Sequence, residues 1–308
     1  MHTPEEPGSL AALEETREPL KFSSYHPARA PQRIDPDNPP WGVPMAFLVW
    51  FSSLLLLGIV PVVFLLPYAA RRGITPAMPD YARALGKFAL KDPTAIFLQV
   101  FSTVPAHLLT VALVWAVVTR FGKQPFWETL GWSWSGRFGL KSSIGLGLVL
   151  FVASSALAHF LGGDKLTPLE EILNSSPATR YTIAFLATFT APFVEEFVFR
   201  GILYSALRRL IGTVGAVIFV VTLFTAVHVP QYRTNYGVIA AIALLSLALT
   251  VLRALSGRLL PCFMVHLVFN GIQSVIILWQ PEVKRPVIAP DHAAALLLSL
   301  GRTLHSII

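Results

Sequence analysis

Long apolar runs without a charged residue alternate with short polar segments along most of the chain. The first run extends from Gly42 to Ala70, and the others lie at about 94–119, 142–163, 181–194, 211–228, 236–252 and 259–281. A helix that rises 1.5 Å per residue needs about 20 apolar residues to cross roughly 30 Å of hydrocarbon. The pattern therefore predicts an all-α, polytopic membrane bundle of about seven to eight transmembrane helices.

The two ends of the chain have a different pattern. Residues 1–40 contain eight prolines, seven acids and few large apolar side chains, which predicts a disordered hydrophilic tail. Residues 282–308 mix apolar faces with scattered basic groups, which indicates a tail or an interfacial helix and, less readily, an eighth span. Between these ends we expect a first group of transmembrane helices over residues 41–175 and a second group over residues 176–281.

Composition also favours lipid as the solvent of this protein. Hydrophobic residues make up 54% of the chain and charged residues 13%, against roughly a quarter charged in ordinary soluble domains. The formal net charge is +7, but Lys and Arg stand singly or in pairs between apolar runs rather than on one solvated face. This distribution argues against a nucleic-acid partner and is typical of loops that face the lipid bilayer.

The basic residues give a mixed signal for orientation. With a cytoplasmic amino terminus, the inner loops after the second span contain nine Lys and Arg, and the outer loops before the last span contain three. The first outer loop opposes this count with Arg71, Arg72, Arg83, Lys87 and Lys91. On the majority of loops, we expect a multi-pass protein of the cell membrane with its amino terminus in the cytoplasm.

Two adjacent acids interrupt the apolar runs at Glu195 and Glu196. An ionisable group at membrane depth costs at least ~2.5–3.5 kcal/mol, so it requires a partner or a watery cavity. Glu196 and Arg200 have the i,i+4 spacing of an ion pair on one helix face, whereas Glu195 points about 100° away from Glu196. We expect Glu196 to pair with Arg200 and Glu195 to remain free. The plainer alternative is a helix end at the interface, with all three groups reaching towards water.

Other polar residues occur in the apolar runs that follow. His228 ends one run, and His266 and Asn270 share a helix face in another because they are four residues apart. Each has a structural alternative, either a satisfied buried histidine or a polar clamp between helices. His107 and His159 lie in earlier runs, where we expect packing or interhelical hydrogen bonds.

Taken together, these groups are sufficient for hydrolysis. Glu195 can activate a water, the imidazoles of His228 and His266 can bind a metal or a developing oxyanion, and Asn270 can donate a hydrogen bond. A metal site would have to be assembled across helices from Glu195, His228 and His266, which is a three-ligand open site that leaves the base unassigned.

The depths of these residues in the membrane conflict if each helix begins where its apolar run begins. His266 would lie ~10 Å from the inner end of its span and His228 ~25 Å from the inner end of its own. We therefore expect the helix of Glu195 to continue through Arg208 and Arg209, with a turn at Gly212–Gly215, so that the next helix brings His228 within ~10 Å of Glu195.

Three motifs in this order, Glu195-Glu196-xxx-Arg200, Phe224-xxx-His228 and His266-xxx-Asn270, resemble the CPBP family of intramembrane proteases. The family is also called the Abi or type II CAAX prenyl endopeptidase family, and the resemblance includes Phe199-Arg200-Gly201-x-Leu203. It covers about residues 180–275 and implies that residues 176–281 form a catalytic transmembrane core.

The resemblance implies an intramembrane endopeptidase that cleaves near the C-terminus or a membrane-adjacent segment of a membrane-anchored peptide or protein. It assigns catalytic roles to Glu195, His228, His266 and Asn270, and structural support of the site to Glu196 and Arg200. The family is described as metallopeptidases, with zinc as the expected ion if one is bound, although a metal-free route is also proposed for it. The alternative is a non-enzymatic membrane protein of the same fold that binds a partner or serves as an accessory subunit.

Overall fold

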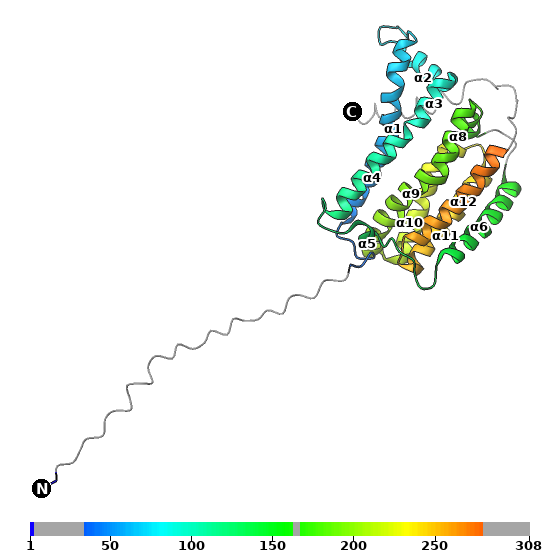
Figure 1. Ribbon diagram of the computed structural model, residues 1–308. Helices are drawn as coiled ribbons and strands as arrows, with labels where there is room; N and C mark the ends of the chain where they lie inside the picture. Colours follow the sequence, from blue (N-terminus) through cyan, green and yellow to red (C-terminus); the bar gives the residue numbers. More distant parts are fainter. Residues whose placement is uncertain (3–33, 163–166, 280–308) are drawn as a thin grey trace. The chain divides into compact units, whose positions relative to one another are not determined.

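The computed structural model describes residues 1–2, 34–162 and 167–279, and this part of the chain is built of helices joined by turns (Figure 1). The predicted tail over residues 3–33 and the predicted terminal segment 282–308 lie outside the described residues. The helices are α1 (Val43–Arg71), α2 (Tyr81–Lys91), α3 (Pro93–Phe101), α4 (Thr103–Thr119), α5 (Phe126–Leu130), α6 (Leu140–Leu161), α7 (Pro168–Leu173), α8 (Pro177–Phe185), η2 (Leu186–Thr190), α9 (Ala191–Glu195), η3 (Glu196–Leu203), α10 (Tyr204–Tyr232), α11 (Tyr236–Ser256) and α12 (Leu260–Trp279).

Six helices among the described residues are long and apolar enough to cross a membrane, which confirms the predicted polytopic helical bundle. They are Val43–Arg71, Pro93–Thr119, Leu140–Leu161, Pro177–Tyr232, Tyr236–Ser256 and Leu260–Trp279. The fourth has 56 residues, more than twice what a single crossing requires. The predicted number of seven to eight is thus approximate, because this fourth element contributes two of the predicted spans.

The 56-residue element folds back on itself at Gly212. Its backbone there has φ 72° and ψ 174°, a conformation that only glycine adopts readily. Phe199 and Phe224 lie 13 residues before and 12 residues after this point, and their ring centroids are 5.0 Å apart. The arms on either side of Gly212 are therefore antiparallel, with the turn at the start of the predicted segment Gly212–Gly215.

The first arm contains two π-helical turns, η2 and η3. Pro192 explains the first of them, because a proline has no N–H with which to continue the regular hydrogen-bond ladder. The N–H of Ala191 donates to the carbonyl of Leu186, five residues earlier, and the carbonyl of Ala187 is left for another donor. The wider turns of this arm, including η3 directly after Glu195, change which side chains face the neighbouring helices.

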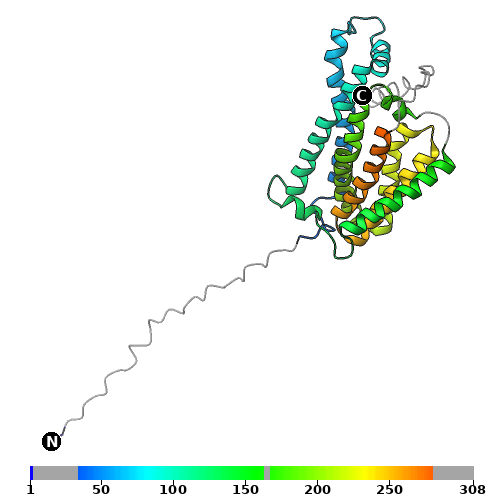
Figure 2. The same ribbon diagram turned by 45° about the vertical axis from the view of Figure 1, so that its right-hand side comes forward.

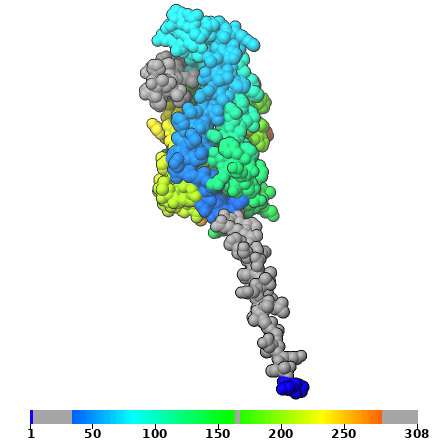
Figure 3. Space-filling model, turned by 90° about the vertical axis from the view of Figure 1, so that its left-hand side faces the viewer, coloured from blue at the N-terminus to red at the C-terminus, as the bar shows by residue number. Residues whose placement is uncertain are grey.

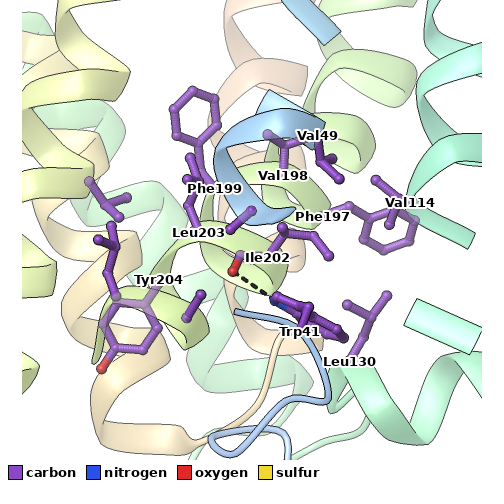
Figure 4. Packing of buried hydrophobic residues seen from close by; sticks show 14 of the residues in the cluster. Trp41, Val49, Val114, Leu130, Phe197, Val198, Phe199, Ile202, Leu203 and Tyr204 are labelled. Carbon is purple, nitrogen blue, oxygen red and sulfur yellow. Dashed lines mark hydrogen bonds between the residues drawn. The ribbon is translucent and has the colours of Figure 1, made fainter. Parts of the chain in front are cut away.

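A large apolar core surrounds η3 (Figure 4). Phe197, Ile202, Leu203 and Tyr204 are fully buried there, and the indole of Trp41 lies against them from the segment that precedes α1. The indole Nε1 donates a hydrogen bond of 3.1 Å to the carbonyl of Ile202, drawn as the dashed line in Figure 4. The core thus joins the first membrane helix to the arm that contains the adjacent acids.

The outward faces of the long helices are strongly apolar. Figure 3 shows α1 and α4 side by side on one face of the bundle, and on α1 the side chains of Phe51, Ile59 and Val63 are each more than half exposed. A water-soluble protein rarely exposes so much contiguous apolar surface, whereas lipid-facing helices must. On another side, α6 packs closely on α12 (Figure 2): a Cβ at Gly147 would lie 2.8 Å from Val268 Cγ1.

Residues 35–41, which we call the anchor segment, are bound to the helix ends. Arg253 donates to the carboxylate of Asp37 at 2.7 Å, and Arg208 forms a second ion pair with it. Arg209 donates to the backbone carbonyls of Pro39 and Trp41. The prediction of a disordered tail as far as residue 40 is therefore wrong for its last residues, because these contacts place them in the folded bundle.

The two arginines also set the charge state of Asp37. Partial burial of the carboxyl acts to raise its pKa, but the charges of Arg253 and Arg208 and the hydrogen bonds from them outweigh this effect, so the pKa of Asp37 is lowered from its ordinary value. The carboxylate is therefore fully ionised at neutral pH and holds the anchor segment through both cations.

Candidate active site

The carboxylate of Glu195 lies between two imidazoles from different helices. Its Oε1 is 3.9 Å from Nε2 of His228 on α10, and its Oε2 is 3.7 Å from Nε2 of His266 on α12. The side chain of Glu195 is 24% exposed and that of His228 is 19% exposed, whereas His266 is 2% exposed. The three side chains therefore converge at one site, which is accessible from outside through Glu195 and His228 but not through His266.

The other ring nitrogens are fixed by hydrogen bonds. Nδ1 of His228 lies 2.7 Å from the carbonyl oxygen of Phe224, and because a carbonyl only accepts, this nitrogen must donate. Nδ1 of His266 lies 2.9 Å from Oε1 of Glu196, a carboxylate that also accepts from Arg200. In the neutral form of each ring, the nitrogen that faces Glu195 thus presents a lone pair.

Glu196 and Arg200 form the predicted ion pair, and both side chains are 0% exposed. Arg200 Nη1 donates to Glu196 Oε1 at 3.1 Å, and its remaining donors reach α11: Nη2 lies 2.9 Å from Ser246 Oγ and Nε lies 3.3 Å from Thr250 Oγ1. The guanidinium carbon also lies 4.5 Å from the centre of the Phe224 ring. A fully buried cation is thus satisfied by three polar groups and an aromatic face.

Asn270 is held by the carbonyl that Pro192 leaves free. Its Nδ2 donates to the oxygen of Ala187 at 2.9 Å, which orients the carboxamide and ties α12 to η2. One turn further along α12, Ser274 accepts from Thr188 at 2.9 Å. The proline that lies three residues before Glu195 therefore provides the acceptor that orients the last residue of another motif.

The predicted conflict of depth is resolved by where α12 begins. Leu259, directly before α12, packs against Gly201, since a Cβ there would lie 3.5 Å from Leu259 Cδ2. Gly201 is 11 residues from Gly212, about 16 Å along a helix, and His266 lies about 10 Å further along α12. His228, 16 residues beyond Gly212, reaches about 24 Å, so both imidazoles arrive at the level of Glu195. The expected separation of less than ~10 Å is confirmed, since Nε2 of His228 lies 3.9 Å from Oε1 of Glu195.

Some contributors to the site were missed in the sequence. Ser246 and Thr250 hold Arg200, and their i,i+4 spacing within an apolar run was the signal that could have identified them. His107 is buried, and its Nδ1 lies 2.9 Å from Thr190 Oγ1, which confirms the expected interhelical hydrogen bond. His159 instead is exposed and makes a ring contact with its neighbour Phe160 on the same helix.

The same side chains do not form a metal site as they lie here. Within residues 34–162 and 167–279, no group of three or more His, Cys, Asp or Glu side chains is arranged to hold a metal ion. The donors themselves are suitable, since two ring nitrogens with lone pairs face one carboxylate and each ring has its second nitrogen fixed, as in histidine ligands generally. Zinc held by Glu195, His228 and His266 therefore stays a prediction, and the chemistry below is derived from the side chains alone.

An apolar groove of about 560 Å³ lies beside Phe193. It is lined by α4, α5 and Phe193, two residues before Glu195, and includes the indoles of Trp115 and Trp127. Phe193 also packs on Phe197 with ring centroids 4.3 Å apart, so the groove borders the apolar core at η3. Such a surface suits a hydrocarbon chain or an apolar peptide segment.

Comparison with known proteins gives one match. Residues 177–272 match the family model described as Type II CAAX prenyl endopeptidase Rce1-like. No curated protein and no solved structure matches the chain. The matched residues include Glu195, Glu196, Arg200, His228, His266 and Asn270. The match confirms the resemblance drawn from the three sequence motifs: over residues 177–272, about a third of its length, the chain is similar to the Rce1-like family of type II CAAX prenyl endopeptidases.

Proposed function

We propose that this protein is an intramembrane endopeptidase in which Glu195 activates the attacking water. The match of residues 177–272 to the Rce1-like family model supports a hydrolase of the CAAX protease type. The observation that carries the proposal is the position of the Glu195 carboxylate, 3.9 Å and 3.7 Å from two imidazole nitrogens that are free to accept protons. These distances exceed a direct hydrogen bond and suit a bridging water.

In the first step a water lies between Glu195 and His228 and donates one hydrogen to each. Its oxygen attacks the carbonyl carbon of the scissile peptide bond, and one proton passes to Glu195. The carbonyl oxygen becomes an oxyanion. His266, when protonated, can donate to this oxyanion from Nε2 while Nδ1 remains bound to Glu196, and the second N–H of the Asn270 carboxamide is a further donor.

In the second step the carbon–nitrogen bond breaks. The proton held at Glu195 passes to the departing nitrogen, which leaves as an amine, and the remaining proton of the water passes from the new carboxylic acid to His228, which leaves a carboxylate. Glu196 and Arg200 touch no reacting atom in this scheme. Their part is to orient His266 and to keep its Nδ1 engaged.

The substrate class follows from the surroundings of the site. Access from lipid and the apolar groove beside Phe193 favour a membrane-anchored peptide or protein, whose hydrocarbon anchor or apolar segment occupies the groove. A prenylated C-terminus and a membrane-adjacent peptide bond both fit this description. The protein would work in the cell membrane, with its amino terminus on the cytoplasmic side.

Cleavage of a panel of prenylated and membrane-anchored peptides by the purified full chain in detergent tests the proposal. Glu195→Gln removes the proton acceptor while keeping shape, so we expect at least ~100-fold slower cleavage with an unchanged thermal midpoint. Glu171→Gln, at an exposed carboxylate on α7, is the matched control and should cleave like the wild type. Each protein is assayed with and without a chelator, and loss of activity on chelation would support zinc.

Two outcomes would count against this mechanism. Equal cleavage by wild type and Glu195→Gln would remove Glu195 from the chemistry. Loss of folded protein in Glu195→Gln as severe as in Glu196→Gln would favour the alternative in which these polar groups only join helices in a non-enzymatic membrane protein.

A further inference from the structure

The loop between the first two membrane helices contains a basic helix that the proposed hydrolysis does not use. In α2 the side chains of Arg83, Lys87 and Lys91 are all exposed. They are spaced by four residues, so each lies only about 40° further around the helix than the one before. Together they form a continuous row, which we call the α2 basic stripe.

The opposite face of α2 is fixed to the protein. Ala89 is buried, Leu85 and Phe88 pack with it against the end of α1, and the rings of Phe88 and Tyr68 have centroids 5.4 Å apart. The helix is thus amphipathic, with its apolar side on α1 and its charges directed away from it.

Its place in the chain sets α2 at the membrane boundary. The charge-free run of α1 ends at Ala70, and the next membrane helix begins at Pro93, directly after Asp92. Figure 1 shows α2 beside the ends of α1 and α3, at the end of the bundle away from α5. A helix between two membrane crossings at this point lies where lipid headgroups lie.

The charge of this segment is not neutralised by its own acids. Residues 71–92 contain five Lys and Arg and two Asp, a net charge of +3. Asp92 caps α3 by accepting from the N–H of Ala95 at 2.9 Å, accepts from Tyr68 at 3.2 Å and faces Arg72 at 3.9 Å, so it is occupied away from the stripe.

We propose that the α2 basic stripe binds the headgroups of anionic phospholipids in the leaflet at this end of the bundle. Complementary charge and a position at headgroup depth favour lipid over an acidic partner from the aqueous phase. The first outer loop contains five cations, which is contrary to the positive-inside rule. The proposal explains them, because binding to lipid phosphates would require cations there whichever way the protein is oriented. It holds whether or not the protein is a protease.

The test compares three full-length proteins in detergent: wild type, Arg83→Gln/Lys87→Gln/Lys91→Gln, and the control Lys123→Gln/Arg137→Gln/Lys141→Gln. The control removes the same charge from exposed positions in the segment after α4 and at the start of α6. Bound lipid is counted by native mass spectrometry during titration with phosphatidylglycerol or phosphatidylcholine. At roughly fivefold per cation, we expect phosphatidylglycerol to bind the stripe variant on the order of 100-fold more weakly, with the control close to wild type.

Three results would overturn the proposal. Wild type could bind both lipids equally, or the stripe variant and the control could lose phosphatidylglycerol to the same extent. Inorganic phosphate at millimolar concentration could also displace phosphatidylglycerol from the wild type, which would make the stripe a site for free phosphate. A shift in the thermal midpoint of the stripe variant without lipid would reveal misfolding, and single substitutions at Lys87 and Lys91 then provide the comparison.

Discussion

Two ionic clusters occur on the same helical arm, and their surroundings differ sharply. The central cluster consists of Glu196, Arg200, Ser246, Thr250 and His266. The end cluster consists of Asp37, Arg208 and Arg253. Both join this arm to α11, but the ion pair of the central cluster is 0% exposed, whereas Asp37 is 23% and Arg208 32% exposed.

The difference shows how burial determines the use of a charge. In the central cluster one atom, Glu196 Oε1, accepts from both Arg200 and His266, so the ion pair also fixes the ring that faces Glu195. In the end cluster the carboxylate of Asp37 is shared by two arginines and attaches a segment of chain. If a partner is removed, water can hydrate the charges left in the partly exposed end cluster but not those left in the buried central cluster.

The largest effect is expected from breaking the central pair. Arg200→Met leaves the buried carboxylate of Glu196 without its cation, with only the hydrogen bond to His266, which should lower the free energy of unfolding by ~3–5 kcal/mol and reduce accumulation in the membrane. The double variant Glu196→Gln/Arg200→Met removes both charges and should recover much of this loss. Unfolding by a denaturing detergent, followed by circular dichroism, measures both.

The double variant also separates stability from catalysis. It should remain inactive or nearly so although the protein is folded, because a neutral carboxamide in place of the Glu196 carboxylate cannot hold His266 in the same way. If Arg200→Met were as stable as the wild type, the result would contradict the complete burial of Glu196 and Arg200 from water.

An intermediate effect is expected from Asp37→Asn. Arg253 is almost fully buried, with 1% of its side chain exposed, and it would lose its charged partner. We expect a loss of about 1–3 kcal/mol in the free energy of unfolding. Asn38→Ala in the same segment is the control, since it removes an exposed hydrogen bond to Arg209 and should change stability little.

The same substitution should change the response to acid. Because the pKa of Asp37 is lower in the folded protein, its stabilising contribution is complete at neutral pH and is lost as the pH falls through the folded pKa. The thermal midpoints of wild type and Asp37→Asn should therefore converge as the pH is lowered from about 7 towards about 3. A constant difference over this range would show that the ion pairs contribute nothing.

The smallest effect is expected at the connection between the two regions. Trp41→Phe removes the hydrogen bond to Ile202 but keeps an aromatic ring in the core beside η3, so we expect a loss of about 0.5–1.5 kcal/mol. The carbonyl of Trp41, which accepts from Arg209, remains. Cleavage by this variant should be unchanged at temperatures well below its thermal midpoint, and slower cleavage there would mean that the anchor segment positions the site.

The sequence predicted correctly the features that depend on the length or periodicity of a single helix. Charge-free runs indicated the membrane helices, the i,i+4 spacing predicted the pair of Glu196 and Arg200, and the glycines at 212 and 215 indicated the turn that brings His228 to Glu195. Each of these follows from the periodicity or length of a single helix.

The remaining features depend on contacts between segments, which periodicity does not contain. Leu259, directly before α12, packs against Gly201, so α12 begins at the level of Gly201. This starting point corrects the predicted depth of His266. Only the structure shows that the ladder is interrupted at Pro192 and that Asn270 donates to the carbonyl of Ala187 that this interruption frees. The anchor segment likewise resembles a polar tail until Arg208 and Arg253 are brought together beneath it.

The fold-back at Gly212 has a consequence for biosynthesis. Glu195 precedes this turn and His228 follows it, while His266 is contributed by α12, so 71 residues of chain separate the first of these groups from the last. At about 5–20 residues per second, a ribosome needs roughly 4–14 seconds to make that stretch. During this interval Glu195 is already in the nascent chain but lacks its second imidazole, so the three groups of the candidate site meet only after α12 has been made and has packed against the earlier helices.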